Sequence, residues 1–287
     1  MKSDTPAAKE REEAQVENRV APPGEIVYEA IYREGEHELS RPARALAWSG
    51  LAAGLSMGFS FLAEALLLQH LPPAVWTSAV SKIGYSIGFV IVILGRQQLF
   101  SKNTLTVILP LLNRRSHAGL WHVARLWVIV LVANLVGALL FAWMLAYSGA
   151  FPPAMHAVFD KLGEEMPRGP FWPVMIRAVI AGWLIALMVW LLPFAETARV
   201  WIIVVIAYLV GLGPFPHIIA ESVSAFYLLI TGQVSLGVCL GGFMVPTFLG
   251  NVVGGVALVA ALAHAELAET AKPKRARASR SLHPPKP

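Results

Sequence analysis

The sequence predicts an all-α membrane protein whose six transmembrane helices form an inverted three-helix repeat with two broken helices. Three observations support this fold class. The 287-residue chain is 56% hydrophobic and 14% charged, with a mean hydropathy of +0.60, whereas a soluble domain carries about a quarter charged residues. The charges are concentrated at the two ends of the chain. Two long apolar runs, one in each half, are interrupted by helix-breaking or polar residues.

The chain divides into three parts. Residues 1–40 form a polar N-terminal tail, in which we expect no cleavable signal peptide because an apolar stretch of about 7–15 residues is missing. Within this tail, residues 26–32 form a weakly amphipathic patch that can lie on the membrane surface or on a neighbouring subunit. Residues 41–265 contain the predicted spans, and residues 266–287 form a basic C-terminal tail.

The first half opens with a glycine-rich span at residues 44–68, in which every fourth residue from Gly50 to Gly58 is glycine. This spacing leaves one helix face free of side chains, so another helix can approach closely. The next run, residues 76–112, is too long for one span of about 20 residues. Polar residues interrupt it at 95–104, so we predict two half-helices joined by a re-entrant loop.

A third span is expected at residues 120–147, followed by a polar loop at residues 148–170. The second half then begins with a span at 172–192. The apolar run that follows, residues 200–230, contains two glycines and two prolines between Gly211 and Pro216. Proline removes a backbone donor and clashes with the preceding turn, so this run will not remain one helix. In lipid, such a break is tolerated only where protein buries it or where it lines a polar cavity.

The sixth span is expected at residues 236–264, and each half ends in a span that carries an Asn-x-x-Gly sequence, at Asn134 and at Asn251. Phe100 precedes the first asparagine by 34 residues, and His217 precedes the second by the same number. We expect both asparagines to be structural, because the amides and carbonyls of an unwound segment need partners. Three spans per half require an inverted second copy, and inverted repeats with broken helices are typical of transporters and channels.

The segments around both breaks resemble the formate/nitrite transporter family, in particular its divergent proteobacterial inner-membrane branch. The resemblance covers about residues 40–265. It rests on residues 99–101, on the segment Phe-Pro-His-Ile-Ile-Ala at 215–220, and on residues 245–255. It implies an aquaporin-like fold and a homopentamer in the bacterial inner (plasma) membrane. Each protomer would have its own pore for small monovalent anions and protons.

The resemblance places His217 at the centre of the pore. An imidazole can donate hydrogen bonds to a passing carboxylate or nitrite, and it can exchange protons near neutral pH. The alternative is a core histidine bonded to a backbone carbonyl. Ser101 matches a family position whose hydroxyl hydrogen-bonds towards this histidine, and Leu99 is the expected apolar gate. The other pore-lining candidates are Gln98, Phe100, Tyr85, Phe89 and Val210. For the pair at 85 and 89, core packing is the alternative.

Four charged residues are expected near the pore: Arg96, Lys102, Glu221 and Glu64. The two cations can attract anions, or they can pair with the two glutamates and hold the loop. We expect pairing, because charged groups inside a membrane usually find partners. Arg96, Lys102 and Glu221 also depart from the family pattern, as does Gln98.

The charge distribution also predicts an orientation. Six crossings place both termini on one side, together with Arg41, Arg114 and Arg199, whereas the opposite loops are uncharged or acidic. Membrane proteins keep excess Lys and Arg on the cytoplasmic side, so we expect both termini in the cytoplasm. The same rule accounts for the net charge of +5 without a nucleic-acid partner.

The sequence thus predicts a channel or proton-coupled transporter for small monovalent anions. The alternatives are a pore for another small solute and a non-conducting membrane scaffold whose tails bind a partner. A single cysteine, Cys239, excludes an internal disulfide and a cysteine-built metal cluster. The sequence has no nucleophile–base pair or cofactor motif, so we expect neither enzymatic activity nor a metal or cofactor.

Overall fold

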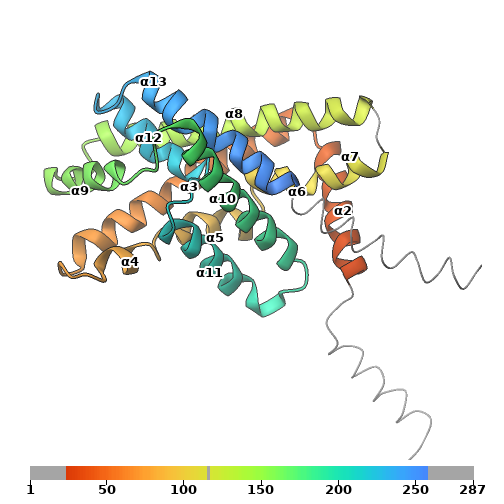
Figure 1. The fold of residues 1–287 in the computed structure, drawn as a ribbon, viewed down its shortest axis with the longest axis horizontal. Coiled ribbons are helices and arrows are strands. Elements are labelled where there is room, and N and C mark those ends of the chain that lie inside the picture. Colours follow the sequence, from red (N-terminus) through yellow and green to blue (C-terminus); the bar gives the residue numbers. More distant parts are fainter. Residues whose placement is uncertain (1–23, 115–116, 258–287) are drawn as a thin grey trace, which may run out of the picture.

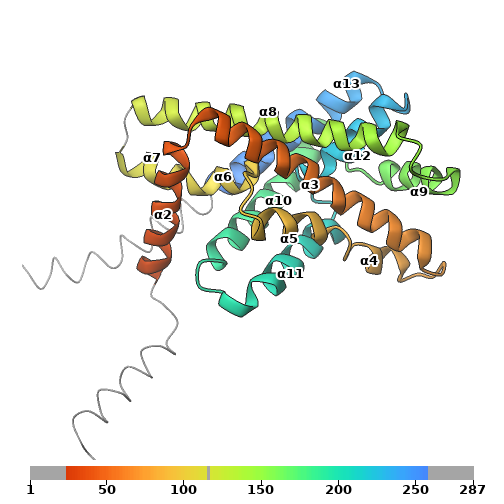
Figure 2. The same cartoon turned by 180° about the vertical axis from the view of Figure 1, so that it is seen from behind.

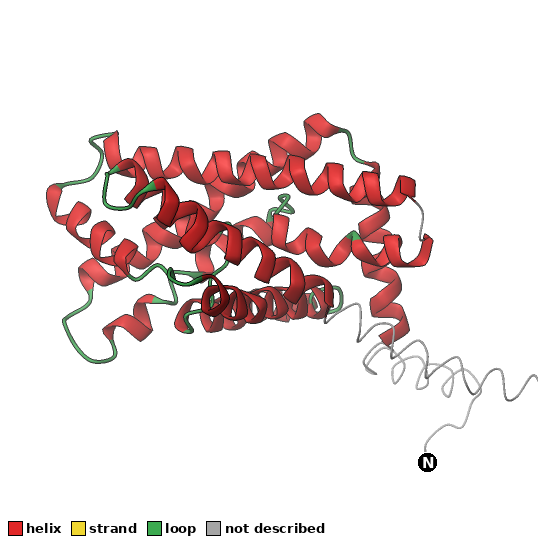
Figure 3. Ribbon diagram, turned by 45° about the horizontal axis from the view of Figure 1, so that its top comes forward, coloured by secondary structure: helices red, strands yellow, loops and turns green. Residues whose placement is uncertain are grey.

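The computed structural model describes residues 24–114 and 117–257, and it contains helices and no strands over these ranges (Figure 3). The long helices run between two ends of an elongated bundle (Figures 1 and 2). One end carries α2 (Gly24–Ser40), and the opposite end carries α9 (Pro153–Glu164). We term these the α2 end and the α9 end.

Helices stand at all six predicted crossings, and the described residues include the sixth as far as residue 257. Four of them are continuous: α3 (Ala43–His70), α8 (His117–Tyr147), α10 (Phe171–Leu191) and the segment Leu236–Ala257. This last segment begins with α13 (Leu236–Cys239) and includes a π-helical stretch at Leu240–Met244. Each of the four continuous crossings is long and apolar enough to cross a membrane, and so is the segment Thr77–Leu94.

The other two crossings are broken, as predicted. The first consists of α4 (Thr77–Ser81), α5 (Ser86–Leu94), α6 (Phe100–Thr106) and α7 (Ile108–Arg114). The second consists of α11 (Arg199–Leu212), which the 3₁₀ turn Glu196–Ala198 precedes, and α12 (Ala220–Ile230). Residues 95–99 separate the half-helices of the first crossing, and residues 213–219 separate those of the second.

Asn134 of α8 satisfies the backbone at the first break. Its Oδ1 accepts a hydrogen bond from the Phe100 N–H at 2.9 Å. Its Nδ2 donates to the carbonyls of Gln98, at 2.8 Å, and Gly50, at 2.7 Å. One buried amide therefore joins the loop to both α3 and α8.

Asn251 makes the same set of bonds at the second break. Its Oδ1 accepts from the Ile218 N–H at 2.8 Å. Its Nδ2 donates to the carbonyls of Pro216, at 3.0 Å, and Ala178, at 2.8 Å. Since this pattern repeats that of the first half bond for bond, the two halves are copies of one arrangement.

These bonds correct the register of the repeat. The residue that donates its N–H to Asn251 is Ile218, so the counterpart of Phe100 is Ile218 and not His217. His217 therefore corresponds to Leu99. The equal spacings of 34 residues were misleading because the second loop lies one residue closer to its asparagine, 33 residues away instead of 34.

Glycines let the spans approach at both asparagines. A Cβ atom at Gly54 would lie 2.1 Å from the Asn134 carbonyl oxygen, and one at Gly182 would lie 2.4 Å from the Asn251 carbonyl oxygen. Side chains cannot fit at these distances. The glycine spacing thus indicates helix–helix contact, as expected.

The connection between α8 and α10 contains a helix, so the prediction of a polar loop at residues 148–170 was wrong. α9 buries Met155, Phe159 and Leu162, which recur every three or four residues, and it packs against α3 and α12. The apolar pattern of so short a segment gave a weak helical signal, which its polar surroundings outweighed.

Part of the predicted N-terminal tail is a docked helix. α2 packs on α6, α7 and α8, and its Ile31 is fully buried. This residue shares a cluster with Leu105, Leu109, Ala186 and Val189. The amphipathic patch at residues 26–32 therefore covers this chain's own transmembrane helices. The rest of that tail, the end of the sixth span and the C-terminal tail lie outside the described residues.

We expect Gly54→Ala to destabilise the protein, because the new methyl group would overlap the Asn134 carbonyl oxygen. Overpacking of this kind costs about 1–3 kcal/mol. The control is Gly241→Ala, since no described residue lies within 4 Å of a Cβ atom there. Thermal unfolding in detergent measures the difference. Equal melting temperatures for both variants would contradict the close approach of α3 and α8.

Candidate functional site

The two breaks meet at a buried side-chain hydrogen bond. His217 Nε2 and Ser101 Oγ lie 2.5 Å apart, and both residues are buried. Ser101 lies in the first turn of α6, and His217 lies in the loop before α12. The structure therefore brings together the two residues that the sequence paired.

Both nitrogens of the His217 ring are engaged. The backbone N–H of Ala220 donates to Nδ1 at 3.2 Å, so Nδ1 is the acceptor nitrogen of a neutral imidazole. Nε2 then carries the ring hydrogen and donates it to the Ser101 hydroxyl. This leaves the Ser101 hydroxyl hydrogen available to a ligand, whereas a second ring proton would require the Ala220 bond to break.

An aromatic side chain packs against the pair. The Phe89 ring lies edge-to-face with the His217 ring at 5.1 Å, and the Tyr85 ring lies 5.6 Å from that of Phe89. Leu99 and Val210 are also buried. As the counterpart of His217, Leu99 occupies a position suited to the predicted gate.

Phe100 and Gln98 are engaged in contacts with neighbouring helices. The Phe100 ring stacks on Phe248 at 5.5 Å. Gln98 Nε2 donates to Glu38 Oε2 at 2.5 Å, and its Oε1 accepts from Asn103 Nδ2 at 2.9 Å. Gln98 thereby ties the first break to α2. These contacts account for both side chains without a solute.

A cavity of about 250 Å³ opens beside the second break, among residues of α3, α9, α11 and α12. We term it the α9-end cavity. Its ionisable and hydroxyl-bearing lining residues include Glu64, Lys82, Tyr85, Glu165, Glu221 and Ser224. One lysine thus shares the cavity with three glutamates.

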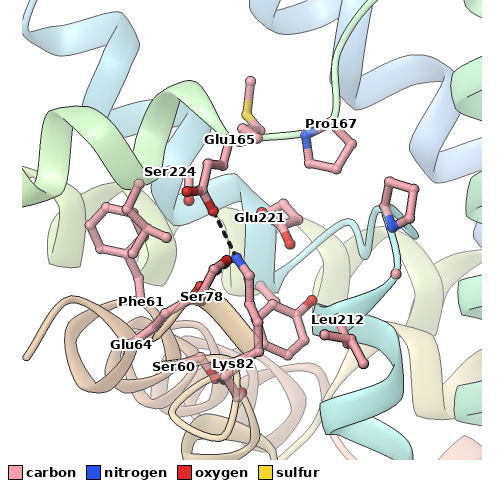
Figure 4. A pocket seen from close by; sticks show the side chains of 17 residues that line it. Ser60, Phe61, Glu64, Ser78, Lys82, Glu165, Pro167, Leu212, Glu221 and Ser224 are labelled. Atoms are coloured by element: carbon pink, nitrogen blue, oxygen red, sulfur yellow. Dashed lines mark hydrogen bonds and ion pairs between the residues drawn. The ribbon is translucent and has the colours of Figure 1, made fainter. Parts of the chain in front are cut away.

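Lys82 lies between two of these carboxylates (Figure 4). Its Nζ atom contacts Glu64 Oε1 and lies 3.1 Å from Glu165 Oε2. Glu221 lines the same cavity as Lys82 and Tyr85. It lies one turn beyond His217, and its N–H donates to the His217 carbonyl at 3.1 Å. The acidic cluster is thus adjacent to the central histidine along the chain.

A larger cavity, of about 600 Å³, opens beside the first break. We term it the α2-end cavity. Its charged lining residues are Arg41, Arg96, Lys102, Arg199, Glu34 and Glu38. Four cations face two carboxylates here, so the two cavities carry opposite excesses of charge.

The expected partners of the charged residues were wrong. Lys102 pairs with Glu34 of α2 at 2.6 Å, and Glu64 pairs with Lys82. Arg96, at a positive φ of 50°, lines the α2-end cavity. The two loops face opposite ends of the molecule, which separates the cations of the first break from the carboxylates beside the second.

Sequence reasoning missed Lys82 and Glu165. Lys82 is the only charged residue between 77 and 95, and an ionisable residue inside a span was a usable signal. Glu165 gave no such signal, because α9 determines its position. Among the described residues, no group of three His, Cys, Asp or Glu side chains could hold a metal ion.

Comparisons with known proteins agree on one family. The sequence model of the formate/nitrite transporter family matches residues 25–265. Inner membrane protein YfdC of Escherichia coli (strain K12) is 36% identical over 259 residues, which cover 90% of this chain and 84% of that protein. Formate channel BtFdhC of Bacillus thuringiensis is 24% identical over 246 residues, which cover 82% of this chain and 92% of that protein.

The fold matches solved structures as well. A pentameric formate channel with formate bound has a TM-score of 0.66 and 19% sequence identity, and the match covers 77% of this chain and 95% of that chain. An ion channel of the same family has a TM-score of 0.66 and 20% identity, covering 82% and 94%. At these identities the likeness establishes the fold.

We expect Lys82→Met to destabilise the protein by about 3–5 kcal/mol, because it leaves the buried Glu64 carboxylate without its partner. Adding Glu64→Gln should restore much of this loss, since the uncompensated charge is removed. Arg33→Met, which breaks an exposed pair with Glu29, should change stability by less than about 1 kcal/mol. Denaturant unfolding of the unmodified protein and of these three variants tests this. No recovery in the double variant would contradict the pairing.

Proposed function

Because the chain belongs to the formate/nitrite transporter family, we propose that it is a multi-pass membrane channel that conducts small monovalent anions such as formate, with His217 and Ser101 at its narrowest point. The observation that carries this proposal is the position of the pair. It joins the two breaks, and a polar cavity lies beside each break.

The pair supplies what a small carboxylate needs at that point. The His217 Nε2–H and the Ser101 hydroxyl are two donors that can turn from one another towards an anion. The Phe89 ring packs against His217, and Leu99, two residues before Ser101, is a buried apolar side chain. A bare anion is costly to bring into such surroundings, so the solute crosses them most easily as a neutral acid.

The orientation and assembly are part of the proposal. The α2-end cavity has an excess of Lys and Arg, which favours a cytoplasmic location for the α2 end and both termini. The bacterial inner membrane is proposed from the relative in Escherichia coli. A homopentamer is proposed from the fold match to a pentameric channel. Large apolar residues exposed along the spans, such as Val128 and Ile176, would then face lipid or neighbouring protomers.

A non-conducting scaffold is the second candidate. It is favoured by the His217–Ser101 bond, which joins these two side chains to each other, and by the contacts that tie Gln98 to α2. A flux measurement separates the two candidates.

Proteoliposomes should take up formate or nitrite, and His217→Phe should lower the rate at least about tenfold. The variant removes one of two donors, and each 1.36 kcal/mol added to the barrier slows transport about tenfold. The control is His122→Phe, because His122 is exposed and, among the described residues, its ring hydrogen-bonds the Ala118 carbonyl of its own helix.

The assay should include formate, nitrite, acetate and hydrosulfide at two pH values. Absence of flux for all four in the unmodified protein would reject the channel in favour of a scaffold. Equal rates for both histidine variants would remove His217 from the conducting path.

A further inference from the structure

The α9-end cavity contains more carboxyl groups than one cation can neutralise. Lys82 contacts Glu64 and lies 3.1 Å from Glu165. Glu221, the third carboxyl group, projects into the same space beside these residues (Figure 4). If all four groups were ionised, the cavity would carry two uncompensated negative charges. Carboxylates that share a site cannot all ionise easily, so such a cluster retains a proton.

Tyr85 gives an independent sign that the cavity receives a polar molecule. Its side chain is only 5% exposed and lines the cavity. Its hydroxyl lies beside the Glu221 carboxyl but makes no hydrogen bond of normal geometry within the described structure. A buried polar group without such a bond is costly. A solute or water in the cavity would satisfy it.

The central histidine is poorly placed to store this proton. Its Nδ1 atom accepts from the Ala220 N–H, and its Nε2–H donates to Ser101. Glu221 lies one helical turn away, at the start of α12, and faces the open cavity. A solute therefore meets the acidic cluster beside His217, where a proton can be exchanged with water from the α9 end.

We propose that Glu221, supported by Glu64 and Lys82, is the proton donor and acceptor for weak-acid solutes in the α9-end cavity. This inference rests on the proposed function. The O–H bond of the Glu221 carboxyl group breaks as an O–H bond forms on the solute anion, which proceeds past His217 as a neutral acid. Lys82 stabilises the resulting carboxylate until water at the α9 end returns a proton. For transport in the opposite direction these steps run in reverse: the neutral acid gives its proton to Glu221, which releases it to water at the α9 end.

The first test is the exchange of labelled formate across proteoliposomes, with equal pH on both sides so that orientation does not matter. Glu221→Gln keeps the shape and hydrogen-bonding capacity of the side chain but cannot carry the proton. We expect its exchange rate to fall at least tenfold at neutral pH. The loss should disappear under acidic conditions, where formic acid itself is present in solution.

Glu164→Gln is the matched control, because Glu164 precedes Glu165, is exposed and lies outside the cavity lining. It removes the same charge from the same end of the molecule and should leave the pH profile unchanged. Identical profiles for the two variants would overturn the proposal. If Glu221→Gln does not fold, Tyr85→Phe provides a second test, with a smaller loss in the same direction, and an unchanged profile would count against the proposal.

A second readout does not depend on transport. Infrared difference spectra of the unmodified protein at neutral pH should contain the carbonyl stretch of a protonated carboxyl group. The band should be lost in Glu221→Gln and retained in Glu164→Gln. A band without formate exchange would reject the proposed function and leave the proton store standing. Exchange without the band would reject the proton store alone.

Discussion

The structure depends on hydrogen bonds to the unwound backbone at its two breaks, which lie in an apolar environment. Each break exposes amide and carbonyl groups that water cannot reach, and an unsatisfied group of this kind costs several kcal/mol in lipid. Asn134 and Asn251 meet this demand with three bonds each, from a third span to a loop and a first span. Glycines allow the spans to come close enough for these bonds. The anchored loops in turn bring Ser101 and His217 together.

The same anchoring separates the two electrostatic environments of the molecule. Because each loop reaches the centre from its own end, the residues that flank the first break line the α2-end cavity, and those that flank the second break line the α9-end cavity. The cations of the first loop join α2, and the carboxylates beside the second loop surround Lys82. The polar centre is therefore bordered by a basic cavity on one side and an acidic one on the other, while the donors at the centre remain neutral.

The sequence was sufficient for features that depend on local composition or on spacing within one element. The apolar runs predicted the crossings, and proline and glycine predicted the break at residues 213–219. The resemblance paired His217 with Ser101. Residues whose neighbours come from distant segments were harder to predict. The partner of Lys102 is on a docked N-terminal helix, and Glu165 reaches the cavity only because α9 folds against α3. Such partners depend on tertiary geometry that no spacing along the chain encodes.

The two halves keep one arrangement at their breaks despite a difference in length. The segment from Ile218 to its asparagine spans 33 residues and the segment from Phe100 to the other spans 34, yet both asparagines make the same bonds. The extra residue lies between loop and asparagine, so the loops themselves stay in register. Leu99 and His217 therefore occupy equivalent places, and the halves can carry an apolar side chain and an imidazole there without disturbing the scaffold that they share.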